Sequence, residues 1–269
     1  MATHAPLAAP AGAGVGALLR GWRQRRRLSQ LDLALDANIS TRHLSFVETG
    51  RAQPSRDMVL RLAEQLAVPL RERNALLAAA GFAPVYRERG LADPALGPAR
   101  KAIDLVLAGH EPYPAVAVDR HWTLVAANQA SERLMAGAAP ALLEPPVNVL
   151  RLSLHPDGMA PRIANLGEWR AHLLRRLRQQ IAVSADAVLV ALLAELEAYP
   201  APPHDDAAAP DYGGVVVPLR LATDAGVLAF FGTTTVFGTP VDITLAELAL
   251  EAFYPADEKT AAVLRGLAG

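Results

Sequence analysis

The sequence predicts two domains of different fold class, an all-α domain followed by an α+β domain with an antiparallel sheet. Apolar residues recur at helical spacing between capping residues over 15–83, and five apolar runs separated by turn residues come later in the chain. A stretch rich in Pro and Gly, residues 84–98, separates these regions and is the expected linker. We therefore expect the second domain to span 99–269, and residues 1–14 to form a disordered tail.

Charge is distributed unevenly along the chain of 269 residues. Residues 1–90 contain 13 Arg, no Lys and seven Asp or Glu, a net charge of +6, whereas the whole chain carries −1. A basic first third is typical of a domain that binds nucleic acid, because cationic side chains neutralise phosphates. The alternative is a chance asymmetry on solvated faces.

Composition also limits the compartment and the chemistry. The chain contains no Cys, which excludes disulfides and thiolate metal sites. The N-terminal residues lack the basic start and long apolar core of a signal peptide, and no apolar run is long enough to span a bilayer. We therefore expect a cytoplasmic protein that does not associate with membranes.

Residues 29–51 have the pattern of two short helices joined by a tight turn. Ser29 and Ser40 are suitable N-caps, and Gly50 ends the second helix. Asn38 stands at the turn, where it tolerates a left-handed backbone better than most residues. The side chains predicted to face inward are Leu31, Ala34, Leu35, Leu44 and Val47.

The outer face of the second helix carries side chains that can read base edges in a DNA major groove. Arg42 is the strongest candidate, because its guanidinium can form two hydrogen bonds with guanine. Helix N-termini and a following Arg can also hold phosphates. The predicted DNA-binding residues are Gln30, Ser40, Thr41, Arg42, His43, Ser45 and Arg51.

This stretch resembles the helix-turn-helix of the phage-repressor-like (XRE) family, which has a lambda-repressor-like all-α fold. The matching residues are Ser29-Gln30, Leu33-Ala34, Ile39-Ser40, Leu44-Ser45, Val47-Glu48, Gly50 and Pro54-Ser55. Asn38 departs from the Gly usual in the family. The resemblance implies that Gln30 reaches DNA and that Glu48 pairs with an Arg of the first helix. The alternative is a small helical bundle with a polar surface.

Further helices complete the first domain. The first runs from about 15 to 27 with several Arg around its apolar face, and some of these are expected along the phosphate backbone. Pro54 is expected to open a helix after the helix-turn-helix, and residues 71–80 form another, which ends at Gly81.

The second domain opens with a helix at 99–108, followed by two strands at 115–119 and 122–128. Asn128 is expected to cap a helix at 129–135. The remaining predicted elements are helices at 168–183 and 187–198, strands at 215–223, 226–238 and 244–255, and a helix at 257–267. The run 244–255 is ambiguous, because its Ala, Glu and Leu favour a helix. Its aromatic end and strand neighbours favour the strand that we predict.

Two strands, a helical insertion and three strands predict an antiparallel sheet with helices over one face, an arrangement that is PAS-like. Residues 110–128, 154–169 and 216–257 resemble the ligand-binding domain of MmyB-type transcription regulators. The resemblance implies a small lipophilic ligand, with fatty-acid-like molecules as a plausible class. Phe230 and Phe231 are the expected apolar contacts, and Arg162 and Asn165 the candidates for a carboxylate head group. The alternative for each Phe is a plain packed core.

No catalytic constellation is apparent. His residues stand beside acids at 110–111, 119–121 and 155–157, yet no second His follows at metal-ligand spacing, and no Walker, dinucleotide or G-x-S-x-G motif occurs. His204 with Asp205 and Asp206 is a weak metal candidate in a low-complexity loop. We expect no enzymatic activity, no catalytic residue, no cofactor and no metal.

Together these patterns predict a one-component transcription regulator. It would bind double-stranded DNA as a homodimer, with half-sites roughly 34 Å apart, and sense a small lipophilic effector. The alternative is a DNA-binding regulator whose second domain serves only as a dimerisation or protein-partner scaffold. An enzyme fused to a DNA-binding domain is the third class, and it would require an acid–base pair in a cleft.

Overall fold

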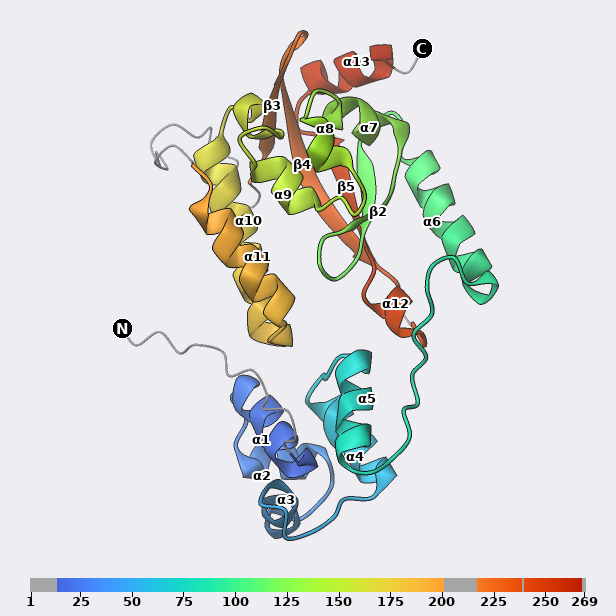
Figure 1. Cartoon of the computed structure of the whole chain (residues 1–269), viewed down its shortest axis with the longest axis vertical. Helices are drawn as coiled ribbons and strands as arrows, with labels where there is room; N and C mark the ends of the chain where they lie inside the picture. The colour runs from blue at the N-terminus through green and yellow to red at the C-terminus, as the bar shows by residue number, and fades with distance from the viewer. Residues whose placement is uncertain (1–13, 201–216, 239, 268–269) are drawn as a thin grey trace. The chain divides into compact units, whose positions relative to one another are not determined.

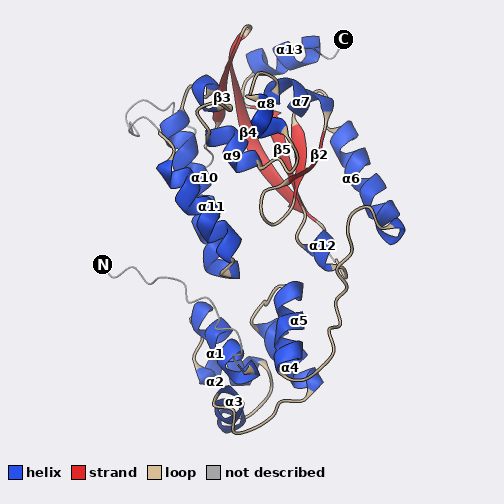
Figure 2. Cartoon of the chain, in the orientation of Figure 1, coloured by secondary structure: helices blue, strands red, loops and turns tan. Residues whose placement is uncertain are grey.

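The computed structural model describes residues 14–200, 217–238 and 240–267 (Figure 1). The chain divides into two compact units, the first built mainly from residues up to Arg89 and the second mainly from Gly90 onward. The first unit is helical, and the second combines helices with a five-stranded antiparallel sheet (Figure 2). The predicted tail falls outside the described residues except for Gly14.

The helices of the first unit pack around one apolar core. They are α1 (Val15–Arg25), α2 (Gln30–Asp36), α3 (Thr41–Glu48), α4 (Arg56–Gln65) and α5 (Leu70–Ala79). The largest buried side chains of this core include Leu19, Leu33, Leu44, Leu62 and Leu77. Burial of these side chains supplies most of the driving force for folding this unit.

The turn signals predicted from the sequence appear in the backbone. Ser29 Oγ accepts a hydrogen bond from the backbone N–H of Asp32, whose side chain in turn accepts from the Ser29 N–H. Ser40 Oγ accepts from the N–H of His43 at the start of α3. Asn38 has a φ of 53° and Gly50 a φ of 73°, so both residues adopt the left-handed conformation that ends a helix.

Two details of the predicted helices are wrong. Leu31 and Leu35 are exposed, whereas Ala34 is buried as predicted. With Ala34, α2 turns Leu33 into the core, and Ala37 follows directly after the helix. The small Ala side chains explain this choice, since they allow α3 and α4 to approach closely. Pro54 does not open α4: Ser55 is the N-cap, and its Oγ accepts from the N–H of Met58.

The segment 84–98 is divided between the units. Asn74 Oδ1 accepts from the N–H groups of Val85 and Tyr86 at 3.0 and 3.1 Å, which holds the start of the segment against α5. The second unit begins with a short 3-10 helix, Pro94–Leu96, which leads into α6 (Gly97–Gly109).

The sheet of the second unit has the strand order β2-β1-β5-β4-β3. The strands are β1 (Ala115–Val118), β2 (Leu124–Ala127), β3 (Leu219–Thr223), β4 (Gly226–Val236) and β5 (Ala249–Pro255). All neighbouring strands pair antiparallel, and Glu251 of the central β5 lies opposite Val116 of β1 and Thr234 of β4. The predicted strand at 244–255 begins late, because Ile243–Ala246 forms the helical turn α12.

Helices lie on both faces of this sheet, whereas the sequence predicted helices over one face. Ile103 and Leu107 of α6 pack against Ala117 and Leu250, which point to one side. The alternate strand residues point to the other side, toward the helices of the insertion. The other helices of this unit are α7 (Gln129–Met135), α8 (Pro140–Leu143), α9 (Val149–Leu154), α10 (Leu166–Ser184), α11 (Ala187–Ala198) and α13 (Glu258–Leu267), besides a 3-10 turn at Ala160–Arg162.

Candidate functional site

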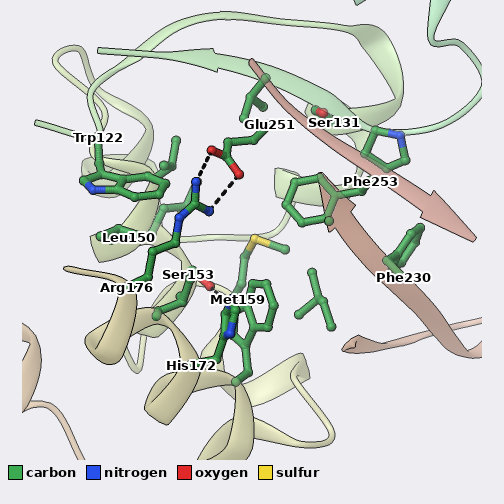
Figure 3. Close-up of a pocket in the computed structure, with 18 of the residues that line it drawn as sticks. Trp122, Ser131, Leu150, Ser153, Met159, His172, Arg176, Phe230, Glu251 and Phe253 are labelled. Atoms are coloured by element: carbon green, nitrogen blue, oxygen red, sulfur yellow. Dashed lines mark hydrogen bonds and ion pairs between the residues drawn. The ribbon is translucent and has the colours of Figure 1, made fainter. Parts of the chain in front are cut away.

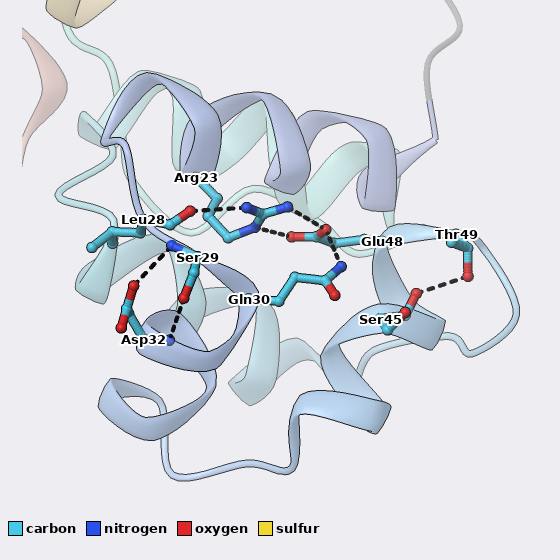
Figure 4. A network of polar contacts seen from close by, with 8 residues as sticks. All are labelled: Arg23, Leu28, Ser29, Gln30, Asp32, Ser45, Glu48 and Thr49. Atoms are coloured by element: carbon cyan, nitrogen blue, oxygen red, sulfur yellow. Dashed lines mark hydrogen bonds and ion pairs between the residues drawn. The ribbon is translucent and has the colours of Figure 1, made fainter.

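A buried polar network ties α1 to the helix-turn-helix (Figure 4). Arg23 of α1 donates from Nε and Nη2 to the two carboxylate oxygens of Glu48 at 2.6 and 2.8 Å, and from Nη1 to the carbonyl of Leu28. Gln30 Nε2 donates to the same carboxylate at 2.8 Å. The network therefore joins α1, the start of α2 and the end of α3, and it supplies the Arg partner expected for Glu48.

Opposing effects set the pKa of Glu48. Burial of its carboxyl would raise the pKa, but hydrogen bonds from Arg23 and Gln30, together with the charge of Arg23, hold it below its usual value. Glu48 is therefore ionised at neutral pH, and its charge is directed into the protein instead of toward a DNA phosphate.

The predicted DNA-binding residues have different surroundings. Arg42 and Arg51 are exposed, and the Arg42 guanidinium lies 5.4 Å from the centre of the Phe46 ring. Thr41, His43 and Ser45 are half-buried along α3, and His43 Nε2 lies 3.3 Å from Met58 Sδ. Ser40 is exposed, but its hydroxyl caps α3.

Gln30 and two Arg residues at the end of α1, Arg23 and Arg26, form contacts within the first unit. The Gln30 amide is oriented by Glu48. Arg26 donates to the carbonyls of Leu66 and Ala67, and so caps the end of α4. Arg23 and Arg26 therefore contribute to the packing of the first unit, and the basic character of α1 does not by itself identify phosphate contacts.

A cavity of about 410 Å³ lies on one face of the sheet in the second unit (Figure 3). Its volume falls within the range typical of small-molecule sites, roughly 300–1,000 Å³. The strand residues that line it alternate, as they must to share one face. They are Val116 of β1, Leu219 of β3, Phe230, Gly232 and Thr234 of β4, and Glu251 and Phe253 of β5.

Helices α7, α9 and α10 supply the opposite wall of the cavity. The apolar lining from these helices and the loops beside them consists of Leu134, Met135, Leu150, Leu152, Met159 and Leu173. Two aromatic rings also line the cavity, Trp122 from the turn between β1 and β2 and Trp169 from α10. The cavity therefore offers a mostly apolar environment between sheet and helices.

One part of the lining is charged. Arg176 of α10 donates from Nη1 and Nη2 to the two carboxylate oxygens of Glu251 at 2.9 and 2.6 Å, and from Nη2 to Thr234 Oγ1 at 2.7 Å. The guanidinium also lies over the Trp122 ring, 4.6 Å from its centre. Arg175, which is exposed, follows on the same helix and also lines the cavity.

His172 adds an imidazole to this basic face of α10, since residues 172, 175 and 176 share one side of a helix. Its ring stacks on Trp169, whose Nε1 donates to Ser153 Oγ at 3.0 Å. Burial lowers the pKa of His172, and the charges of Arg176 and Arg175 lower it further. The imidazole is thus neutral at physiological pH, and a nearby anion would favour its protonation.

The four predicted ligand contacts have different places in the structure. Phe230 lines the cavity, but Phe231 points to the other face of β4, where it stacks on Tyr254. Arg162 donates to the carbonyl of Leu134, and Asn165 bonds the backbone of Pro218 and Arg220. These two side chains stabilise the walls, and neither lines the cavity.

Sequence reasoning missed His172, Arg176 and Glu251. A signal was available for each. Glu251 is a charged residue two positions before Phe253 on the same strand, so the two side chains share the face that lines the cavity. His172 and Arg176 are polar residues one helical turn apart, among buried leucines of α10. No pattern in the sequence indicates that Arg176 and Glu251 pair, because the two residues are 75 positions apart.

Other site classes find little support within the described part of the chain. No group of three His, Asp or Glu side chains is placed to hold a metal ion there, and the His204–Asp206 candidate lies outside that part. None of its helices combines the length and the apolar character needed to cross a membrane.

Comparisons with known proteins agree with this architecture. A helix-turn-helix domain model matches residues 15–76, and the model of the MmyB-like transcription regulator ligand binding domain matches residues 99–267. No curated protein shows significant similarity to the chain.

One solved structure, described as an RNA-binding light-oxygen-voltage receptor, is 16% identical, with a TM-score of 0.27. The alignment covers 94% of this chain and 63% of that one, so the chain spans less than two thirds of the receptor's length. A TM-score this low supports no inference about function.

The ligand-binding model covers more than half of the chain and follows a helix-turn-helix, so the protein belongs to the MmyB-like transcription regulators, DNA-binding proteins with a ligand-binding domain.

Proposed function

We propose that the chain is a one-component, non-enzymatic regulator of the XRE type, whose PAS-like second unit binds a lipophilic acid and thereby changes the affinity of the first unit for operator DNA. The observation that carries this proposal is the cavity, which combines apolar walls with one face of α10 that bears the cations Arg175 and Arg176 beside the neutral imidazole of His172. A linear molecule with an acidic head group, such as a fatty acid, matches both properties.

Burial of the ligand's hydrocarbon chain would provide most of the binding free energy, at about 0.8 kcal/mol for each CH₂ group removed from water. The head group would set the orientation, because a carboxylate is strongly favoured next to an Arg fork. Affinity should therefore rise with chain length until the cavity of about 410 Å³ is filled, and then level off or fall.

The first unit would act as a homodimer on a two-fold operator in the cytoplasm. Exposed Arg42 on α3 is suited to base contacts, and the N-terminus of α3 with exposed Arg51 is suited to phosphates. Half-sites would lie about one turn of DNA, roughly 34 Å, apart.

The test is a thermal-unfolding series on the full chain with saturated linear acids of 8 to 18 carbons, accompanied by mass spectrometry of molecules that co-purify. We expect the midpoint temperature to rise with chain length to an optimum, because a ligand that binds only the folded state stabilises it. If no acid shifts the midpoint and none co-purifies, the second unit is better explained as a dimerisation or protein-partner scaffold.

A further inference from the structure

The ion pair between Arg176 and Glu251 spans the cavity from one wall to the other (Figure 3). Arg176 belongs to α10 and Glu251 to the central strand β5, so their two hydrogen bonds tether the helix to the sheet. Thr234 Oγ1 lies 3.1 and 3.3 Å from the two Glu251 oxygens and accepts from Arg176. The guanidinium is thus held at a fixed position by Glu251, Thr234 and the Trp122 ring.

The Glu251 carboxylate has the geometry of a ligand head group. It presents two oxygens to the planar fork of Arg176, as a free carboxylic acid would in its ionised form. Its side chain is only 7% exposed, among cavity-lining residues, whereas the Arg176 side chain is 32% exposed. The cation is therefore more accessible than its partner, and two carboxylates cannot use the same pair of N–H groups at once.

We propose that Glu251 occupies the anion-binding position of the cavity in the ligand-free chain, and that an acidic ligand binds by displacing it from Arg176. The inference rests on the proposed function, since it concerns the head group of the same ligand. After the exchange, Glu251 keeps Thr234 as a hydrogen-bond donor, while the tether between α10 and β5 is broken. Ligand binding therefore removes the ion pair that connects α10 to the sheet.

This exchange predicts selective effects on acids. Tetradecanoic acid and tetradecanol share an apolar chain, and only the acid competes for Arg176. Their affinities for the full chain are measured by titration calorimetry in wild type, Glu251→Gln and Arg176→Gln. Glu88→Gln is the matched control, because Glu88 forms a similar two-bond pair with Arg71 in the first unit.

In Glu251→Gln the internal anion is lost, so we expect the acid to bind at least about tenfold more tightly and the alcohol to change by less than about twofold. In Arg176→Gln the preference for the acid over the alcohol should disappear, because Glu251 then remains as an unpaired anion. Glu88→Gln should leave both affinities at the wild-type values.

Distinct results overturn the two proposals. An unchanged ratio of acid to alcohol affinity in Glu251→Gln, or a retained acid preference in Arg176→Gln, contradicts the exchange while leaving ligand binding intact. If neither the acid nor the alcohol binds to wild type or to any of the three variants, the proposed function itself is contradicted. Far-ultraviolet circular dichroism checks folding, and if one cavity variant fails to fold, the other still decides the outcome.

Discussion

At the scale of single residues, some side chains of α3 pack in the core and others face the solvent. Leu44, Val47 and Glu48 are buried, while Arg42 is exposed and its guanidinium lies over the edge of the core, near the half-buried Phe46 ring. This division leaves the guanidinium of Arg42 able to contact a base edge without disturbing the packing below it.

Replacing Arg42 with Ala should therefore weaken DNA binding and relax its sequence preference at one base pair. Loss of an Arg–guanine pair is worth about 1–3 kcal/mol, or roughly fivefold to 150-fold in affinity. Gel-shift titrations against selected and single-base-changed duplexes measure both effects, with Arg265→Ala of α13 as the control. If affinity and preference both survive in Arg42→Ala, this residue does not read the operator.

Glu48 makes the stability of the first unit depend on pH. Its pKa is lower in the folded chain than in the unfolded chain, so its contribution is complete above the usual Glu pKa of about 4.3 and is lost as pH falls through the folded value. Glu48→Gln leaves the buried Arg23 cation without its counter-ion, which should lower the unfolding free energy at pH 7 by about 3 kcal/mol.

Urea unfolding monitored by Trp22 fluorescence measures this difference. The gap between wild type and Glu48→Gln should shrink as pH falls below about 4, because the wild-type carboxyl then becomes neutral as well. Trp122→Phe and Trp169→Phe in both backgrounds confine the signal to Trp22 of the first unit. A gap that stays constant from pH 7 to pH 3 would show that the charge of Glu48 is not what stabilises the unit.

At the scale of elements, Asn128 joins three segments of the second unit. Its buried Oδ1 accepts from the N–H groups of Ala115 and Ser131, and its Nδ2 donates to the carbonyls of Leu107 and Tyr113. The side chain thus caps α7, as the sequence predicted, and also fixes the end of α6 to β1.

Replacing Asn128 with Ala should lower the unfolding free energy of the second unit by about 2–4 kcal/mol, since four backbone groups lose a hydrogen bond and three of these bonds are buried. Asn148→Ala is the matched comparison. Asn148 caps α9 and bonds the His121 carbonyl, but it is half-buried, so we expect a loss of about 1 kcal/mol. Equal losses in the two variants, measured by urea unfolding, would contradict the role given to burial.

Local signals explain why much of the fold was predictable. Ser29, Asn38, Gly50 and Asn128 act on backbone groups a few residues away, so their effects follow from short stretches of sequence. Leu31 and Leu35 were wrongly placed on the inward face of α2 because they form a regular stripe with Ala34, and only packing against α3 and α4 selects Leu33 instead. The Arg176–Glu251 pair was missed because no local pattern brings a helix and a distant strand together.

At the scale of the whole molecule, the proposed function requires that cavity occupancy and DNA affinity are coupled. A ligand changes DNA binding only if it favours one conformation of the chain over another, and couplings of this kind are typically about 1–3 kcal/mol. By reciprocity, operator DNA must then change the affinity for the ligand by the same factor.

Gly232 offers a control for this coupling, because it lies on the cavity face of β4 and a β-carbon there would sit 3.6 Å from the Phe253 ring. A Leu at this position would extend into the cavity. We expect Gly232→Leu to bind tetradecanoic acid at least about tenfold more weakly than wild type while retaining its affinity for DNA. Loss of DNA binding in this variant would mean that it disturbs more than the cavity.

The most direct test measures the affinity of the full chain for a selected operator, at one fixed salt concentration, with and without saturating tetradecanoic acid. Wild type should show a change of about fivefold to a hundredfold, and Gly232→Leu should need at least about tenfold more acid to show the same change. An operator affinity that stays the same in wild type when calorimetry shows the cavity to be saturated would contradict the coupling of the two units.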